Sequence, residues 1–237
     1  MQVEYRRHVS LQITGADEVL KALNNGVEIK LVLVDREEDC TEIIRMCESK
    51  NIPVTEGSST DLWRMSANGH QKALALVGRE PKGTLEEVFG REGVIWLFDG
   101  VEYAPNLGFG VRTAEVSGAT AVIINVKKTH DERRTIRRAG MRATRFIPVI
   151  YATTEEVLAA CNRRIVVAED VGDKAPWNAD LTGDVLLVVG AENAGVSKEV
   201  LDAADDIVRL PMPGFVPSYN LQVAVSALAI ERLRQSE

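Results

Sequence analysis

Side chains that could take part in chemistry gather in three stretches of the second half of the chain. In the first, "NLGFGVRTAEVSGA", Asn106 and Arg112 stand among glycines in what reads as a turn that leads into a helix. A guanidinium in the first turn of a helix opposes the helix dipole unless an anion or polar ligand meets it, so Arg112 is predicted to face a ligand. Taken alone, Asn106 and the glycines fit an ordinary turn and helix cap better than a binding site.

The second stretch, "VVGAENAGVS", overlaps an apolar run at 185–190 that predicts a buried strand. Gly190 at the end of this run would let a ligand approach the backbone closely, because glycine has no side chain. Just beyond it, the carboxylate of Glu192 could orient a hydroxyl or pair with an arginine. The plainer alternative is a strand-to-helix loop in which Ser197 is the helix N-cap.

The third stretch, "LPMPGFVPSYNLQVAVSALA", begins with a stiff loop. Pro211, Pro213 and Pro217 each fix φ, so the loop loses little entropy when it is held in one shape. Ser218 is placed to cap the helix that follows. Eight of the ten residues at 221–230 are apolar, which predicts a helix buried on most sides. Two alternatives stay open, a core helix within one chain and a helix shared with a second subunit.

A fourth feature is the basic stretch "KKTHDERRTIRRAGMRATR" at 127–145. Its eight Lys and Arg against two acidic residues give a local charge of +6, while the remainder of the chain carries -13. A charge run is usually a solvated helix face, but the contrast with an acidic remainder favours a footprint for a phosphate backbone. The predicted RNA-binding residues are Lys127, Lys128, Arg133, Arg134, Arg137 and Arg138.

The elements that must position these residues follow an α/β pattern. Apolar runs predict strands, and helical stretches separate most of them, which is typical of a parallel sheet covered by helices on both faces. In such sheets ligands bind in the loops at the carboxyl ends of the strands, and the three stretches fall in such loops. The predicted strands are at residues 94–98, 121–126, 146–151, 164–169, 185–190 and 206–210.

The length of 237 residues, of which 45% are hydrophobic, allows one or two domains. We predict a small α/β domain at 1–78, with a buried strand at 29–35, and a larger domain at 94–237. Charges, proline and glycines predict a connector at 79–93. Capping boxes predict helix starts at Thr14, Ser58, Thr84 and Thr153.

Composition argues against several classes of protein. The net charge of -7 is not that of a uniformly basic nucleic-acid binder. Cys40, Cys47 and Cys161 show no CxxC spacing, so neither a disulfide framework nor a zinc site is predicted. There is no signal-like segment and no uncharged run near the roughly 18 residues of a membrane span. We therefore expect a cytoplasmic protein without a membrane partner.

In this order and spacing, the three stretches resemble the three motifs of the SpoU (TrmH) family of RNA ribose 2′-O-methyltransferases, over roughly residues 94–237. The first domain resembles the small substrate-binding domain often fused to these enzymes, a fold akin to certain RNA-binding ribosomal proteins. "HQKALALV" stands where that domain ends in an HQG-type sequence, with Lys72 in place of the glycine. "RAGMRA" departs from the serine- and glycine-bearing sequence common in the middle of the second domain. The resemblance implies the α/β knot of the SPOUT class, with a C-terminal trefoil knot, although knots are rare in proteins.

The resemblance also implies the chemistry. It is methyl transfer from S-adenosylmethionine to a ribose 2′-hydroxyl of ribosomal RNA, with transfer RNA as the alternative substrate. The resemblance implies a homodimer joined through the C-terminal domain and a reaction without a metal. Tyr219 replaces the leucine usual in its motif. The implied catalytic residues are Arg112, Asn106, Glu192, Ser218 and Asn220. The implied cofactor-binding residues are Gly190, Ala191, Leu210, Met212 and Tyr219.

Two other functions compete with this interpretation. A non-catalytic RNA-binding or ribosome-assembly factor that kept the fold would retain RNA without affinity for the cofactor. A nicotinamide-dependent oxidoreductase would require "GFGVRT" to bind pyrophosphate. That motif is incomplete, because Thr113 stands where the third glycine belongs, and it lies too far past its strand for the dinucleotide turn.

Overall fold

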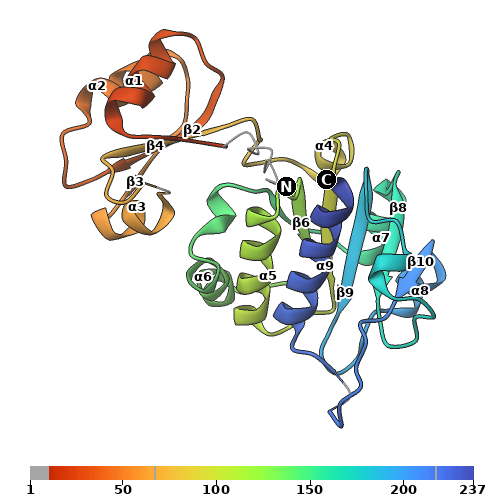
Figure 1. The fold of residues 1–237 in the computed structure, drawn as a ribbon. Coiled ribbons are helices and arrows are strands. Elements are labelled where there is room, and N and C mark those ends of the chain that lie inside the picture. Colours follow the sequence, from red (N-terminus) through yellow and green to blue (C-terminus); the bar gives the residue numbers. More distant parts are fainter. Residues whose placement is uncertain (1–10, 67, 217) are drawn as a thin grey trace, which may run out of the picture. The chain divides into compact units, whose positions relative to one another are not determined.

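The computed structural model describes residues 11–66, 68–216 and 218–237 and divides the chain into two compact units, Met1–Pro81 and Lys82–Glu237 (Figure 1). The boundary between the two units falls near the start of the connector predicted at 79–93, so most of that segment belongs to the second unit. Helix α4 (Leu85–Phe89) forms there, and its buried Val88 and Phe89 belong to the core of the second unit. The capping box at Thr84 starts this helix as predicted.

Within residues 11–66 and 68–81, the first unit forms a four-stranded sheet with three helices. Its strands are β1 (Gln12–Thr14), β2 (Ile29–Asp35), β3 (Val54–Gly57) and β4 (Ala73–Val77), in the order β1-β4-β2-β3. β2 pairs with β3 in parallel, and the other pairs are antiparallel. The helices are α1 (Ala16–Asn24), α2 (Thr41–Ser49) and α3 (Ser59–Met65). Apolar residues of β2 and β4 pack with those of α1 and α2 to form the core, as expected of a small α/β domain.

The start of α1 differs from the prediction. Thr14 is the last residue of β1, and its hydroxyl accepts a hydrogen bond from Nδ2 of Asn68 at 2.8 Å. Gly15 is the N-cap instead, with a φ of 99° that turns the chain directly from strand to helix. The capping box predicted at Thr14 is therefore wrong, because the hydroxyl has another partner and the turn depends on glycine. The boxes at Ser58 and Thr153 are confirmed.

The second unit is built on a six-stranded sheet in which every pair is parallel. The strand order is β10-β8-β9-β5-β6-β7. All six predicted strands are confirmed, most of them shorter than predicted: β5 (Val94–Asp99), β6 (Ala121–Ile124), β7 (Val149–Tyr151), β8 (Arg164–Ala168), β9 (Val185–Gly190) and β10 (Asp206–Val208). Near-continuous burial along β5 and β9, the two central strands, explains their uniformly apolar sequences.

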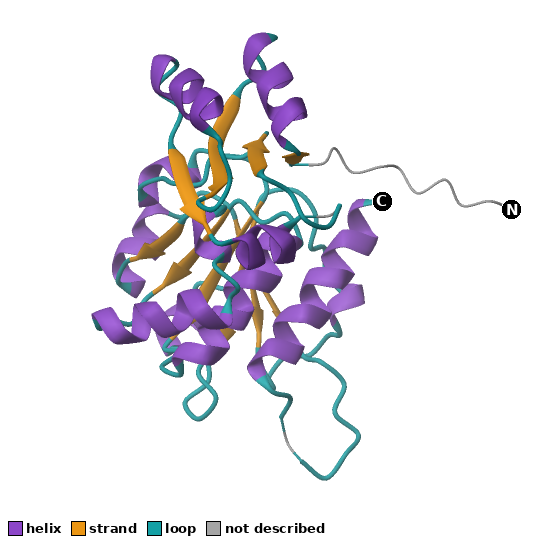
Figure 2. Ribbon diagram, turned by 90° about the vertical axis from the view of Figure 1, so that its left-hand side faces the viewer, coloured by secondary structure: helices purple, strands orange, loops and turns teal. Residues whose placement is uncertain are grey.

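Helices cover both faces of this sheet (Figures 1 and 2). One face carries α5 (Ala104–Val116), α6 (His130–Ala139) and α9 (Leu221–Ser236), and the other carries α4, α7 (Thr154–Ala160) and α8 (Lys198–Asp202). Alternate residues of β5 serve the two cores, so Trp96 and Phe98 face α5 and α9, whereas Leu97 faces the opposite layer. Burial of each such side chain stabilises the fold by about 1.5–3 kcal/mol.

Neither a membrane-spanning helix nor a cluster of metal-binding side chains is found among the described residues. Among residues 11–66, 68–216 and 218–237, no helix is both long enough and apolar enough to cross a membrane. Within the same ranges, no group of three or more His, Cys, Asp or Glu side chains is arranged to hold a metal ion.

Candidate active site

A cleft lies at the carboxyl ends of β8, β9 and β10, the edge of a parallel sheet where ligands bind. Its volume is about 540 Å³, which is within the roughly 300–1,000 Å³ typical of small-molecule sites. Its walls come from the end of β8, the loop after β9, and the chain between β10 and α9. The five residues predicted to hold a cofactor all line it: Gly190, Ala191, Leu210, Met212 and Tyr219.

The loop after β9 folds back on itself to form one wall. The N–H of Ala191 donates to the carbonyl of Gly195 at 3.2 Å, and the N–H of Gly195 donates back at 2.9 Å. A Cβ on Gly190 would lie closer than 3.0 Å to the backbone of Gly195 and of Val196. We predicted that Gly190 admits a ligand to the backbone. In the structure, the segment that lies against the backbone of Gly190 is the protein's own loop after β9.

Asn106 and Glu192, predicted in separate stretches, meet at the edge of this cleft. Asn106 lies in the first turn of α5 and is 8% exposed. Its Nδ2 donates a hydrogen bond to Oε1 of Glu192, which lines the cleft. The amide therefore holds the carboxylate in place and joins the first stretch to the second.

The stretch that contains Asn106 is helical as far as Val116, so the predicted glycine-bearing turn around Gly108 and Gly110 is wrong. Gly108 and Gly110 lie inside α5, at positions where no larger residue fits. A Cβ on Gly108 would lie 2.6 Å from the carbonyl oxygen of Ile136 in α6, and one on Gly110 would lie closer than 3.0 Å to the ring of Phe98 in β5. The glycines thus let α5 pack closely against a neighbouring helix and the sheet.

Arg112 lies in the second half of α5. The predicted position in the first turn of a helix is wrong, and so is the dipole argument that rested on it. Six residues separate Arg112 from Asn106, which corresponds to about 9 Å along the helix and about 120° around it. Arg112 is exposed and is absent from the described residues that line the cleft of its own chain. The two side chains therefore project from different sides of α5.

The third stretch supplies a further wall of the cleft, through Leu210, Met212, Ser218, Tyr219 and Asn220. The hydroxyl of Tyr219 donates to the carbonyl of Pro211 at 2.8 Å and so joins the two ends of the loop. The N-cap of α9 is Asn220, whose side chain accepts the N–H of Gln222 at 2.9 Å. The prediction that Ser218 is the cap is wrong, because the helix begins at Leu221. Pro217 lies outside the described residues.

A polar network that the sequence analysis did not single out supports the loop after β9. Asp99, the last residue of β5, is 1% exposed and accepts hydrogen bonds from the N–H of Ser197 and from Nδ2 of Asn125. Oδ1 of Asn125 in turn accepts the N–H of Gly100 at 2.7 Å. The sequence signal for this network is an acidic residue directly after five apolar ones, because a buried carboxylate requires hydrogen-bond donors.

Helix α6 carries most of the basic stretch. Five of the six residues predicted to bind RNA are exposed: Lys127, Arg133, Arg134, Arg137 and Arg138. The guanidinium of Arg133 lies 4.3 Å from the centre of the Tyr151 ring. Lys128 is buried, and its Nζ donates to the carbonyl of Glu102 at 2.6 Å. Contrary to prediction, Lys128 is therefore not available to RNA, because its ammonium group is held inside the fold.

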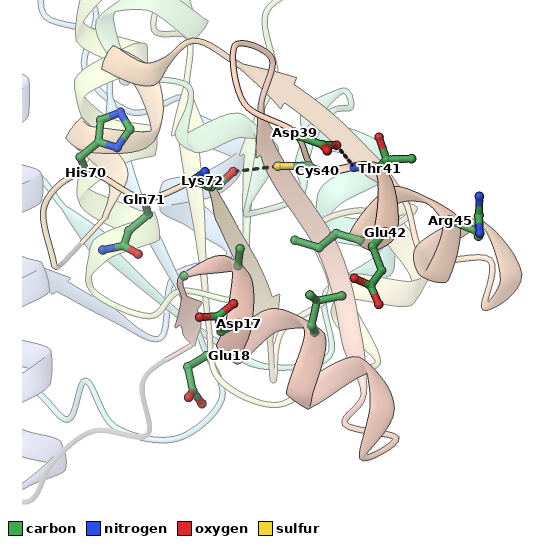
Figure 3. Close-up of a pocket in the computed structure, with 14 residues that line it drawn as sticks. Asp17, Glu18, Asp39, Cys40, Thr41, Glu42, Arg45, His70, Gln71 and Lys72 are labelled. Atoms are coloured by element: carbon green, nitrogen blue, oxygen red, sulfur yellow. Dashed lines mark hydrogen bonds between the residues drawn. The ribbon is translucent and has the colours of Figure 1, made fainter.

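The first unit contains a separate pocket of about 1,000 Å³ (Figure 3). It is lined by the first turns of α1 and α2 and by residues 70–72. Lys72 pairs with Glu38 at 2.6 Å, and its carbonyl accepts the thiol of Cys40 at 3.5 Å. Four carboxylates lie on the walls: Asp17, Glu18, Asp39 and Glu42. Arg45 and Lys72 also line the pocket, so four acidic side chains stand against two basic ones there.

Comparison with known proteins gives a consistent result. The model of the SpoU rRNA Methylase family matches residues 93–230, more than half of the chain. The 23S rRNA (guanosine-2′-O-)-methyltransferase RlmB of Pseudomonas aeruginosa is 34% identical over 194 residues, which cover 78% of each protein. The protein of the same name in Xanthomonas campestris is 28% identical over 242 residues, which cover 94% of this chain and 96% of that protein.

Solved structures show the same fold. An AdoMet-bound rRNA methyltransferase from Sinorhizobium meliloti aligns with a TM-score of 0.62 at 24% identity, over 94% of this chain and 87% of that one. A structure described as an RNA 2′-O ribose methyltransferase aligns with a TM-score of 0.56 at 25% identity, over 95% of this chain and 88% of that one. The family model, the sequence relatives and the three motifs around one cleft agree, and the chain belongs to the SpoU rRNA methylase family.

Proposed function

We propose that this protein transfers the methyl group of S-adenosylmethionine to a ribose 2′-hydroxyl of ribosomal RNA. The observation that carries the proposal is the cleft at the ends of β8, β9 and β10, where residues from the second and third motifs form the walls and Asn106 of the first motif holds Glu192 at the edge. Two of the relatives described above are named 23S rRNA methyltransferases, which favours ribosomal RNA over transfer RNA.

The cleft fits the cofactor in its chemistry. Apolar side chains on its walls suit an adenine ring and the methionine chain: Val189, Leu210, Met212, Leu221 and Ala224. Carboxylates on the same walls suit a sulfonium, whose charge is positive. Backbone amides and carbonyls of 190–195 suit the polar edge of the base. Once bound, the cofactor supplies an electrophilic methyl group.

The residues around the cleft must orient the ribose hydroxyl and remove its proton. Glu192 is exposed at the cleft edge and fixed by Asn106, so its carboxylate can accept a hydrogen bond from the 2′-hydroxyl. The guanidinium of Arg112 serves to hold the adjacent phosphate and to stabilise negative charge on the ribose oxygen. Ser218 and Asn220 add polar groups to the same wall.

We further propose that the protein is a homodimer and that Arg112 acts on the cleft of the partner. α5 and α9 pack side by side on the sheet (Figure 1). The outer surface of α9 exposes Val223, Ala227 and Ile230, which are spaced four and three residues apart and form one apolar stripe. On α5, the exposed Arg112 is accompanied by Val116, whose side chain is 75% exposed. A second copy covering this surface would bury the stripe and place Arg112 at an interface.

RNA binding is assigned to two regions. The exposed arginines of α6 offer charges to a phosphate backbone. In the first unit, which resembles a substrate-binding domain, Trp63 of α3 is 57% exposed and stands next to the exposed Arg64. An exposed indole beside a guanidinium is a stacking surface for an unpaired base. Quenching of Trp63 fluorescence by ribosomal RNA fragments in a Trp177→Phe protein tests this assignment, since Trp96 is buried.

The trefoil knot is also part of the proposal. Oε2 of Glu169 accepts the N–H of Val196 at 3.0 Å, which closes residues 169–196 into a loop. After this loop, α8 packs on one face of the sheet. The chain then passes through β10 and along the cleft, and it continues as α9 on the other face of the sheet. This change of faces beside a closed loop supports a threaded path. A crystal structure in which residues 209–220 pass outside the loop 169–196 would contradict it.

The function is tested by incubating the purified protein with labelled S-adenosylmethionine and bulk ribosomal RNA. We expect label in RNA with the wild type and none with Arg112→Ala, while calorimetry shows that Arg112→Ala still binds the cofactor. Cofactor binding without transfer to any RNA would contradict the proposed reaction. Absence of cofactor binding together with retention of RNA would indicate a non-catalytic RNA-binding protein.

The shared site is tested by mixing two inactive variants, Arg112→Ala and Glu192→Gln, and letting subunits exchange. If Arg112 acts across the interface, a mixed dimer contains one intact site of two. About half of the dimers in an equimolar mixture are mixed, so the mixture recovers about a quarter of wild-type activity. If Arg112 serves its own chain, each site of the mixed dimer carries one defect and no activity returns.

A further inference from the structure

Glu169 lines the cleft but belongs to none of the three motifs. It follows the last residue of β8, and its side chain is half-buried. Oε2 accepts the N–H of Val196 at 3.0 Å. The carboxylate also lies against Gly195, where a Cβ would come within 2.9 Å of Oε1. Two contacts with the loop after β9 therefore fix this carboxylate on the cleft wall.

The charged side chains of the cleft are unbalanced. Three acidic residues line it, Glu169, Asp170 and Glu192, against a single basic one, Arg209. Asp170, Glu192 and Arg209 are exposed, so water and salt screen their charges. Glu169 is the one lining carboxylate among the described residues that is partly withdrawn from solvent. Its field inside the cleft is accordingly the least screened of the three acids.

The reactant and the product of methyl transfer differ by one charge. S-adenosylmethionine carries a positive sulfonium, whereas S-adenosylhomocysteine carries a neutral thioether in its place, and the remaining groups are the same. A fixed negative charge near the sulfur position therefore changes the relative affinity for the two molecules. At an effective dielectric of about 20, a carboxylate roughly 12 Å from a bound unit charge changes affinity by about tenfold, and a closer one changes it by more.

We propose that Glu169 is a specificity-determining residue of the cofactor cleft, where its carboxylate favours the positively charged sulfonium cofactor over the neutral product. This inference rests on the proposed function, because it assumes that the cleft binds S-adenosylmethionine. The consequence for the reaction is that transfer of the methyl group removes the charge that Glu169 attracts. Product release is thereby favoured and the free enzyme is reloaded with cofactor.

Glu169→Gln tests the charge alone. The glutamine carbonyl can still accept the N–H of Val196, so the loop keeps its hydrogen bond. Isothermal titration calorimetry with S-adenosylmethionine and with S-adenosylhomocysteine measures both affinities without turnover. We expect the variant to bind S-adenosylmethionine about tenfold more weakly and the product with unchanged affinity. Sinefungin, which carries an ammonium group in place of the sulfonium, should weaken as S-adenosylmethionine does.

Glu199→Gln is the matched control, because Glu199 is an exposed glutamate of α8 outside the lining of the cleft. It should leave the ratio of the two affinities unchanged. Thermal melting of both variants checks that they are folded. If Glu169→Gln weakens both ligands equally, or neither, the proposal is overturned while the proposed function stands. If the wild type binds neither ligand, the proposed function fails as well.

Discussion

Replacing Gly190 with alanine tests whether the loop after β9 shapes the cleft. The added Cβ would lie closer than 3.0 Å to backbone atoms of Gly195 and Val196, and backbone cannot rotate away as a flexible side chain can. The loop must therefore shift, which breaks the paired hydrogen bonds between Ala191 and Gly195. Overpacking costs about 1–3 kcal/mol and each of the two lost hydrogen bonds about 1 kcal/mol, so the free energy of unfolding should fall by at least about 3 kcal/mol.

For a domain of this size, a loss of 3 kcal/mol lowers Tm by about 6–12 °C, which scanning calorimetry measures directly. The affinity for S-adenosylmethionine should fall at least about tenfold, because Gly190 and Ala191 both line the cleft. Gly214→Ala is the matched control. Gly214 lies between two residues of the cleft wall, and nothing stands within 4 Å of a Cβ placed there. A Gly190→Ala protein that melts and binds cofactor as the Gly214→Ala protein does would refute the reasoning.

Three further predictions concern stability and RNA binding. Arg163→Ala removes a guanidinium that donates hydrogen bonds to the carbonyls of Gly93, Phe89 and Arg91 at 2.7–2.9 Å. Urea denaturation should show that the free energy of unfolding falls by about 3 kcal/mol, and a fall below about 1 kcal/mol would contradict this. Hydrogen bonds from Arg234 and Gln235 hold the pKa of Glu231 at about 2, below its usual 4.5. The ionised Glu231 therefore contributes fully to stability above pH 4.5, and this contribution is lost as the pH falls towards 2. The difference in unfolding free energy between wild type and Glu231→Gln should therefore shrink between pH 6 and pH 3, and a constant difference would count against the linkage. Replacing Arg137 and Arg138 of α6 together with alanine should reduce the slope of log affinity for RNA against log salt concentration by about 1.4–1.8, and an unchanged slope would place the RNA elsewhere.

The elements that could be predicted from sequence are those whose causes are local. Each of the six strands of the second unit is a short apolar run, and burial on both faces of a parallel sheet requires that composition. The capping boxes at Ser58, Thr84 and Thr153 each depend on two side chains three residues apart, and all three are present. The box at Thr14 fails because its hydroxyl bonds to Asn68, more than fifty residues away in sequence.

The errors at the site have a common physical origin. From the sequence alone, the glycines in "NLGFGVRT" indicate a turn, because glycine is unfavourable inside a helix by about 1 kcal/mol. In α5 that cost is offset by close packing, since side chains at Gly108 and Gly110 would collide with α6 and β5. The same holds at Gly190, where the partner is the chain's own loop. Asp99 and Glu169 went unnoticed because their partners, Ser197 and Val196, come from a distant segment.

Because α5 is a helix, the spacing of Asn106 and Arg112 determines the sides to which their side chains project. A turn could direct Asn106 and Arg112 to one site, but a helix separates residues six positions apart by about 120°. Asn106 bonds to Glu192 of its own chain, whereas the exposed Arg112 is not among the described residues that line that cleft. The catalytic role proposed for Arg112 therefore requires that another molecule brings a cleft to it. The exposed Val223 and Ile230 of the neighbouring α9 provide the apolar area that a second copy would cover. On this reasoning, variants of α9 that keep the protein monomeric, such as Ile230→Asp, should retain cofactor binding and lose methyl transfer. A fully active monomer would show that no partner is needed and that Arg112 does not act across an interface.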